Sequence, residues 1–387
     1  MNGIYFDNGS TSWPKAPGVA RAVAELLEQG AFNINRGNYE GAYQVEGAVL
    51  ETREQLARLF HAENSRGAVF TPSVTYSLNF FLKGFLKPGD HVVVTGLEHN
   101  AVMRPLKQLE SRGVSFDIAS VDREGNLDLE DLESRIRTNT KAVLATHASN
   151  VCGTIVPAEK VGEICRKHGL IFGLDTAQTA GTLEIDMEGW GVDFLAFTGH
   201  KGLLGPQGIG GFLISKRLDQ EMEPLIGGGT GSQSDSLLMP ETLPDKYESG
   251  TLNLPGIIGL HAALDYLEQV GIFSLHRRKM ELTGYFLERV RGIPGLRIVG
   301  KKDCQGRVAV VSLDFTETDN ALAAFELEQR AGVMTRVGLH CAPVAHRYLG
   351  TFPSGTVRFA FSASNTEAEI DRCIDAVYQI MGYSKKQ

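Results

Sequence analysis

Between residues 66 and 214 the chain alternates short apolar runs with stretches of helical pattern, and this alternation limits the possible folds more than any other feature. The runs are rich in Val, Ile and Phe: AVFT (68–71), HVVVT (91–95), AVLATH (142–147), LIFGLD (170–175), DFLAFT (193–198) and GIGGFLIS (208–215). Between two of them, residues 161–169 predict a crossover helix that has basic residues in its last turn and ends at Gly169. The alternation predicts an α/β fold, with a mostly parallel sheet between helices.

The C-terminal part of the chain predicts a smaller α+β domain with a sheet of its own. A Gly-rich loop (226–236) precedes a helical stretch over about 256–292, and a further helix is expected over 319–331. The strand-like runs are LRIVG (296–300), RVAVVSLDF (307–315), VMTRVG (333–338) and TVRFAFS (356–362). Thr366 and Glu369 have the spacing of a capping box at the start of a last helix. Since 387 residues exceed the usual single-core size, we predict a large domain over 16–255 and a small one over 1–15 and 256–387.

Charge and cysteine usage exclude several classes of function. The net charge of −8 argues against nucleic acid or an anionic membrane as the main partner, because both favour a basic face. Because the chain shows neither a basic leader with an apolar segment nor 18 uninterrupted apolar residues, we expect a cytoplasmic protein. The five cysteines are scattered and include no Cys-x-x-Cys pair, which predicts neither a disulfide framework nor a metal site.

Polar residues follow four of the apolar runs at the point where each run ends. They are Glu98-His99-Asn100, Ser149-Asn150, Asp175 with Gln178, and Gly199-His200-Lys201. Ligands of parallel α/β sheets bind outside the carboxyl ends of the strands. The four groups are therefore expected to meet in one crevice.

Asp175 and Lys201 form the pair with the clearest chemistry. An ionised carboxylate at the end of an apolar run needs a cation or a helix N-terminus, so an N-cap or a simple ion pair is the alternative for Asp175. Lys201 is followed by the glycine-dense stretch GLLGPQGIGG, which lets backbone approach a ligand, although a lone lysine is more often a surface residue. Together they suit pyridoxal 5'-phosphate (PLP), in which the lysine forms the Schiff base and the carboxylate holds the pyridine nitrogen protonated.

A phosphate cradle is predicted where the first apolar run leads into a helix. The free backbone N–H groups of Ser73 and Val74 and the hydroxyl of Thr75 would face an anion at the helix N-terminus, unless the segment is only a turn. Thr198 and His200, beside the lysine, can donate to the same phosphate. His99 could stack on the pyridine ring of the cofactor and exchange protons. For both His99 and His200 the alternative is a structural role.

These residues, in this order, resemble the fold-type I PLP enzymes of the class V aminotransferase group, and within it the cysteine desulfurases. The similarity spans nearly the whole chain, with TGHK before GPQGIG typical of the group and GLHCAP typical of the desulfurases. The segments that carry it are 4–15, 70–79, 98–100, 149–154, 174–178, 198–210, 248–256, 336–343 and 357–370. The resemblance implies a homodimer with active sites at the subunit interface.

The resemblance also implies a role for each matching residue. Lys201 would be the Schiff-base lysine, Asp175 would pair with the pyridine nitrogen, and Asn150 and Arg358 would face the substrate carboxylate, which guanidinium binds bidentately. The other cofactor contacts would be Gln178 on the ring oxygen, His99 stacked on the ring, Thr75, Thr198 and His200 on the phosphate, and Thr251 on the phosphate from the partner subunit.

Cys341 is implied to accept sulfur from L-cysteine as a persulfide, leaving L-alanine. Gly338 and Pro343 would shape its turn, His340 would stabilise the thiolate, and the short interval to Arg358 resembles the SUF-type branch. Two other functions stay open: another class V enzyme, such as an aminotransferase or selenocysteine lyase, and a PLP-binding scaffold without turnover. The sulfur-acceptor protein and the end product, whether iron–sulfur clusters, thiolated RNA or another, also stay open.

Overall fold

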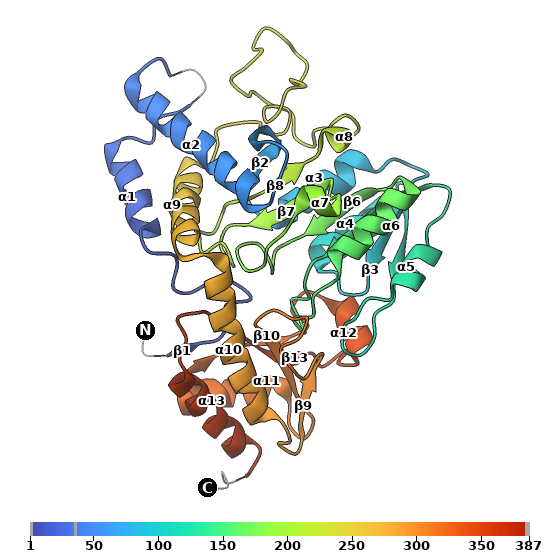
Figure 1. Cartoon of the computed structure of the whole chain (residues 1–387), viewed down its shortest axis with the longest axis vertical. Helices are drawn as coiled ribbons and strands as arrows, with labels where there is room; N and C mark the ends of the chain where they lie inside the picture. The colour runs from blue at the N-terminus through green and yellow to red at the C-terminus, as the bar shows by residue number, and fades with distance from the viewer. Residues whose placement is uncertain (1–2, 35–36, 384–387) are drawn as a thin grey trace.

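The computed structural model describes residues 3–34 and 37–383, and its centre is a seven-stranded sheet (Figure 1). Strand β8 runs antiparallel to both neighbours and all other neighbouring pairs of strands are parallel, which confirms the predicted α/β fold. The edge strand β4 was not predicted, because its SFDIA sequence is mostly half-buried and has no apolar run. In spatial order the strands are β2 (Ala68–Thr71), β8 (Gly210–Ile214), β7 (Phe194–Thr198), β6 (Ile171–Asp175), β5 (Thr140–Thr146), β3 (His91–Thr95) and β4 (Ser115–Ala119).

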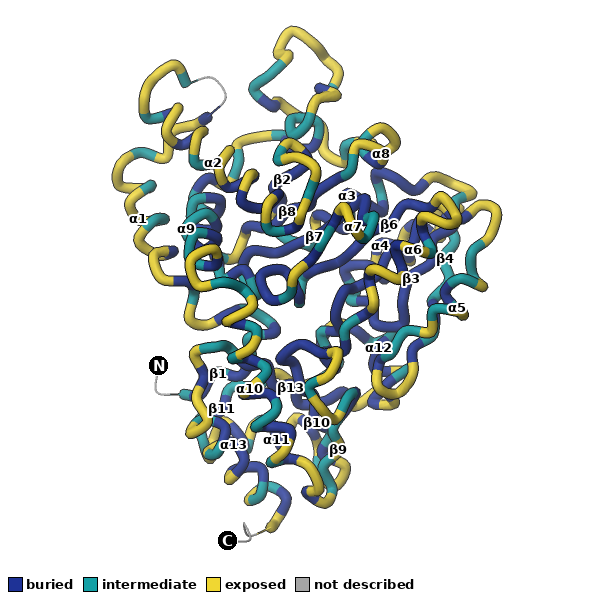
Figure 2. The backbone as a smooth tube through the Cα atoms, in the orientation of Figure 1, coloured by how far each residue is buried: buried dark blue, intermediate teal, exposed yellow. Residues whose placement is uncertain are grey.

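Helices cover both faces of this sheet, so its central strands are buried throughout (Figure 2). Successive side chains of a strand point to opposite faces. Val92 and Val94 accordingly pack with α3 (Val74–Phe85) and α4 (Asn100–Glu110), whereas Val93 packs with α2 (Glu40–Leu59) and α6 (Ala158–His168). Helix α6 ends at Gly169 in the left-handed conformation (φ 68°), as predicted from the sequence.

A second, antiparallel sheet lies below the first in Figure 1, in the order β12 (Arg336–Gly338), β13 (Thr356–Ala360), β10 (Val310–Phe315) and β9 (Leu296–Val299). Helices α11 (Asn320–Ala331) and α13 (Glu367–Ile380) pack on it, and α13 begins with the predicted capping box of Thr366 and Glu369. The run predicted over 333–338 is divided. Its first part, β11 (Val333–Met334), pairs in parallel with the N-terminal β1 (Ile4–Tyr5) instead of joining this sheet.

The helical stretch predicted over 256–292 is two helices that link the two sheets. They are α9 (Leu254–Val270) and α10 (Ile272–Val290), separated at Gly271, whose φ of 80° ends the first helix. Helix α9 packs on α1 (Val19–Gln29) and α2, whereas α10 packs on α13. The remaining helices are short: η1 (Ser65–Gly67), α5 (Leu129–Ser134), α7 (Met187–Trp190), α8 (Lys216–Asp219) and α12 (Pro343–Leu349). Within the described residues, no helix has both the length and the apolar character to cross a membrane.

Candidate active site

Asp175 and Lys201 reach one crevice from neighbouring strands. Asp175 is the last residue of β6, it pairs with Ala196 of β7, and Lys201 follows the end of β7 by three residues. Burial raises the pKa of Asp175, and its Oδ1 accepts a hydrogen bond from Ala177 N at 2.9 Å. Burial also lowers the pKa of Lys201 to about 8, although the carboxylate of Asp175 partly opposes this shift. The structure therefore holds an acid and an amine close enough to influence each other's charge.

The predicted phosphate cradle has buried polar atoms that no other described residue satisfies. Ser73 precedes α3 and makes no side-chain capping hydrogen bond, and the Thr75 side chain is exposed. Thr198 Oγ1 and His200 Nδ1 are buried and have no hydrogen-bond partner among the described residues. A Cβ on Gly210 would lie 3.1 Å from the Ser73 Cα, so glycine there lets β8 approach this helix N-terminus closely. Donors arranged around a helix N-terminus suit a phosphate group.

His99 lies at the N-terminus of α4 as a neutral imidazole. Its Nδ1 accepts a hydrogen bond from Ala101 N at 3.0 Å, which leaves the proton on Nε2. Burial, followed by the charges of Lys201 and Arg358, lowers the pKa of His99 to about 4. A neutral ring with a fixed tautomer can stack on an aromatic cofactor without adding charge.

Arg358 is buried in β13 within a network that sequence reasoning missed. Its Nη2 donates to Asp7 Oδ1 at 2.9 Å and Ser10 Oγ at 2.6 Å, and its Nη1 donates to the backbone oxygen of Asn150 at 3.0 Å. Its Nε is buried with no partner among the described residues. The matching segment 4–15, which contains Asp7 and Ser10, was the available signal, but nothing in it showed which distant cation Asp7 would meet. Arg358 and Asn150 therefore lie together, as predicted for a carboxylate site.

Cys341 is exposed on a tight turn that is hydrogen-bonded to residues of the candidate site. His340 and Cys341 both have left-handed backbone, with φ of 47° and 57°, and Gly338 has φ of 106°. Asn100 N donates to Cys341 O, and Asn150 Nδ2 donates to His340 O, both at 2.7 Å. Asn100 follows His99, which is predicted to stack on the cofactor, and Asn150 is predicted to bind the substrate. The two hydrogen bonds therefore fix the thiol turn beside both predicted positions.

The predicted role of His340 beside the thiolate stays a prediction, and the structure shows how the ring is held. Burial, with Arg358 and His346 nearby, lowers the pKa of His340 to about 2, and its Nε2 lies 2.9 Å from Thr356 Oγ1. The contact with Thr356 anchors the neutral ring at the base of the thiol turn. Cys165 and Cys373 are buried, and burial raises the pKa of both thiols.

Gln178 and Thr251, two predicted cofactor contacts, differ in their surroundings. The amide of Gln178 donates from Nε2 to Gly9 O at 3.0 Å, which ties the N-terminal segment to the end of β6. Thr251 is exposed on a loop next to Glu248, which forms a buried ion pair with Arg53. A contact of Thr251 with the partner subunit's cofactor stays a prediction.

The residues present fit PLP. The ring nitrogen of PLP needs a carboxylate, its aldehyde carbon an amine and its phosphate several donors. The crevice offers Asp175, Lys201, and the unsatisfied donors of Thr198 and His200 beside the α3 N-terminus.

Comparisons with known proteins agree with this arrangement. The sequence profile of the family described as aminotransferase class-V matches residues 4–373. Proteins named probable cysteine desulfurase are similar over 98% of the chain: one from Methanothermobacter thermautotrophicus is 33% identical over 95% of its own length, and one from Pyrococcus abyssi is 34% identical over 94%.

Solved structures of cysteine desulfurases have the same fold. The apo cysteine desulfurase of Thermococcus onnurineus is 31% identical, with a TM-score of 0.91, and CsdA of Escherichia coli is 26% identical, with a TM-score of 0.88. Both similarities cover 98% of this chain and 95% of the other. The chain therefore belongs to the class-V aminotransferase family of PLP-dependent enzymes, among relatives named cysteine desulfurases.

Proposed function

We propose that the protein is a PLP-dependent cysteine desulfurase, which converts L-cysteine to L-alanine and collects the sulfur as a persulfide on Cys341. The observation that carries this proposal is the position of the thiol. Cys341 is exposed, and its turn is bonded to Asn100 and Asn150, which flank the predicted cofactor and substrate positions. An accessible thiol held beside the reacting atoms is what sulfur capture requires.

PLP, when bound, supplies an electron sink for negative charge that develops at the substrate α-carbon. Asp175 would hold its ring nitrogen, and the α3 N-terminus with Thr75, Thr198 and His200 would hold its phosphate. Arg358 and Asn150 would bind the substrate carboxylate, because the guanidinium already faces the oxygens of Asp7 and Ser10 and can exchange one of them for a carboxylate.

Lys201 is suited to move the proton of the substrate α-carbon. With a pKa of about 8, its amine is partly neutral at physiological pH and can accept a proton and return it. The Cys341 thiolate then attacks the substrate sulfur: the substrate C–S bond breaks, an S–S bond forms, and the former Cβ gains a proton. Because the thiol is oxidised while the substrate carbon is reduced, the exchange needs no external oxidant.

The test is to supply L-cysteine and a reductant to the PLP-loaded protein and to measure alanine and sulfide. Cys341→Ala should keep the bound-cofactor absorbance but lose alanine formation, whereas Cys304→Ala, a partly exposed control cysteine, should behave as the wild type. Undiminished alanine from Cys341→Ala would favour another class V activity, such as transamination or selenocysteine lysis. Bound cofactor with no turnover of any amino acid would favour a scaffold.

We further propose a cytoplasmic homodimer, in which Thr251 of one subunit contacts the cofactor phosphate of the other. We also propose that each subunit divides into a large domain over 16–255 and a small domain over 1–15 and 256–387. Exposed apolar side chains on and beside the loop that precedes Thr251, such as Leu225, Leu237 and Leu238, support a covered surface there. A dimer mass in solution and lost cofactor retention in Thr251→Ala are the expected results.

The persulfide sulfur would pass to an acceptor protein, and iron–sulfur cluster assembly is one possible use of that sulfur. Transfer assays against candidate acceptors would identify the acceptor protein.

A further inference from the structure

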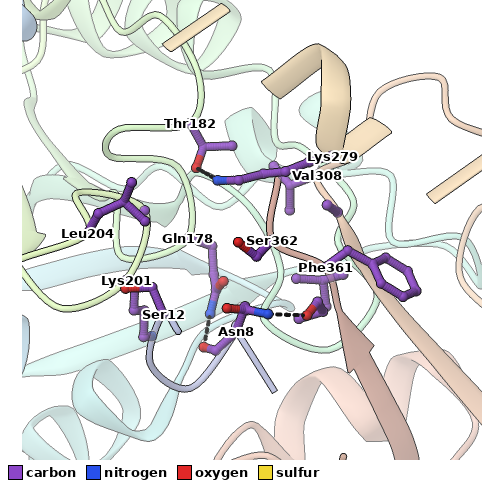
Figure 3. Close-up of a pocket in the computed structure, with 15 residues that line it drawn as sticks. Asn8, Ser12, Gln178, Thr182, Lys201, Leu204, Lys279, Val308, Phe361 and Ser362 are labelled. Atoms are coloured by element: carbon purple, nitrogen blue, oxygen red, sulfur yellow. Dashed lines mark hydrogen bonds between the residues drawn. The ribbon is translucent and has the colours of Figure 1, made fainter. Parts of the chain in front are cut away.

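A small pocket beside Lys201 is lined by hydrogen-bond donors and two lysines. Its volume is about 50 Å³, and it lies between the ends of β6 and β7, the N-terminal segment and α10. None of the described acidic residues lines it. The donor side chains in its wall come from Asn8, Ser12, Gln178, Thr182, Lys201, Lys279 and Ser362 (Figure 3).

Lys279 is the unusual member of this wall. Its side chain extends from α10 toward Thr182, and Nζ lies 3.5 Å from Thr182 Oγ1 (Figure 3). The residue is only 9% exposed, and no described carboxylate lies within 4.0 Å of its ammonium. Burial lowers the pKa of Lys279 to about 8, because desolvation disfavours the charged ammonium. In its charged form the lysine brings to the pocket a positive charge that no described carboxylate compensates.

The buried arginines among the described residues have compensating partners. Arg53 forms an ion pair with Glu248, and Arg358 forms one with Asp7. Arg307, which lacks an acid, donates to three backbone carbonyls instead. A buried charge without such partners is strongly unfavourable and favours the neutral amine, so an anion bound beside Lys279 would stabilise its ammonium form.

We propose that this pocket binds a compact inorganic oxyanion of the size of sulfate, held by the Lys279 ammonium and the Thr182 and Ser362 hydroxyls. The volume corresponds to about three to five water-sized positions, which matches the four or five non-hydrogen atoms of such an ion. The remaining wall includes the apolar residues Leu204, Val308 and Phe361. The pocket wall also contains Lys201 and Gln178 of the predicted cofactor site, but Lys279, Thr182 and Ser362, which would hold the ion, are not among the predicted cofactor contacts.

The experiment measures the thermal unfolding of the PLP-loaded protein, so that the phosphate cradle is filled, at neutral pH in a gluconate buffer. Gluconate maintains ionic strength and is too large for the pocket. Sulfate added in place of gluconate should raise the unfolding midpoint along a saturating one-site curve. Lys279→Met, close in shape but uncharged, should begin with a higher midpoint and show no saturating rise.

Thr182→Val gives a second test that does not depend on the folding of Lys279→Met. Loss of one hydroxyl donor should raise the dissociation constant of sulfate, measured by calorimetric titration, roughly threefold to tenfold. An equal sulfate response in wild type and Lys279→Met would overturn the proposal, because the ion would then act elsewhere, for example at Arg358. No response of the wild type beyond that to gluconate would overturn it as well.

Discussion

The buried ion pair between Arg53 and Glu248 offers the sharpest test of how the loop carrying Thr251 is held. Arg53 Nη2 lies 2.6 Å from Glu248 Oε2 and Nη1 lies 2.9 Å from Oε1, and the side chains are 7% and 5% exposed. Phe70 N also donates to Glu248 Oε1 at 2.6 Å, and Arg53 donates to Ala68 O. The pair therefore joins α2, β2 and this loop. Replacing Glu248 by Gln keeps the shape but removes the charge.

Glu248→Gln should lower the free energy of unfolding by about 3 kcal/mol, the lower end of the range for breaking a buried pair, because the amide oxygen still accepts one bond. Its NH₂ group would face the Arg53 donor at the position of Oε2. Glu268→Gln is the matched control: Glu268 pairs with Arg58 of the same helix α2 at 3.1 Å, but both side chains are more than half exposed. That change should lower the free energy of unfolding by less than about 1 kcal/mol.

Urea unfolding followed by intrinsic fluorescence measures both losses. Adding Arg53→Met to Glu248→Gln should recover much of the loss, because the uncompensated charge is then gone. Equal losses in Glu248→Gln and Glu268→Gln would refute the reasoning, since burial would then make no difference to the pair. A double variant no more stable than Glu248→Gln would refute it independently.

Three further predictions concern the active site. Lys201→Ala should abolish the visible absorbance of covalently bound cofactor, as measured by spectrophotometry, and a retained covalent band would remove this lysine from its role. Asp175→Ala should still bind cofactor but lower the rate of alanine formation more than tenfold, because losing a charge-assisted contact should exceed about 1.4 kcal/mol. Burial raises the pKa of Glu98 from 4.5 to about 8, so the folded state holds a proton that the unfolded state loses. The stability of wild type relative to Glu98→Gln should therefore fall as pH rises from 4.5 to about 8, and parallel pH profiles of unfolding would contradict this.

The parts of the site that follow from local sequence could be predicted. Asp175 and Lys201 come directly after apolar runs, and the carboxyl ends of neighbouring parallel strands must meet, so their proximity followed from the strand pattern. The predicted caps at Gly169 and Thr366 depend only on nearby residues, and both are present.

Contacts between distant segments could not be predicted in the same way. The bond of Arg358 to Asp7 joins residues 351 positions apart, and the pocket position of Lys279 depends on how α10 packs across the ends of β6 and β7. The division of residues 333–338 into β11 and β12 likewise depends on β1, which arrives from the other end of the chain. The charge of His340 depended on its burial, which its sequence neighbours do not reveal.

The anchored turn at Cys341 has a consequence for delivery of sulfur. With its carbonyl and that of His340 both hydrogen-bonded to the rim of the crevice, the thiol has a very short reach. If the proposed function holds, Cys341 would receive the sulfur and pass it on at the same position, without a mobile loop that carries the persulfide away from the site. A sulfur acceptor would have to bring its own nucleophile to this exposed turn. The shape of the protein surface around Cys341 would therefore determine which acceptors can receive the sulfur.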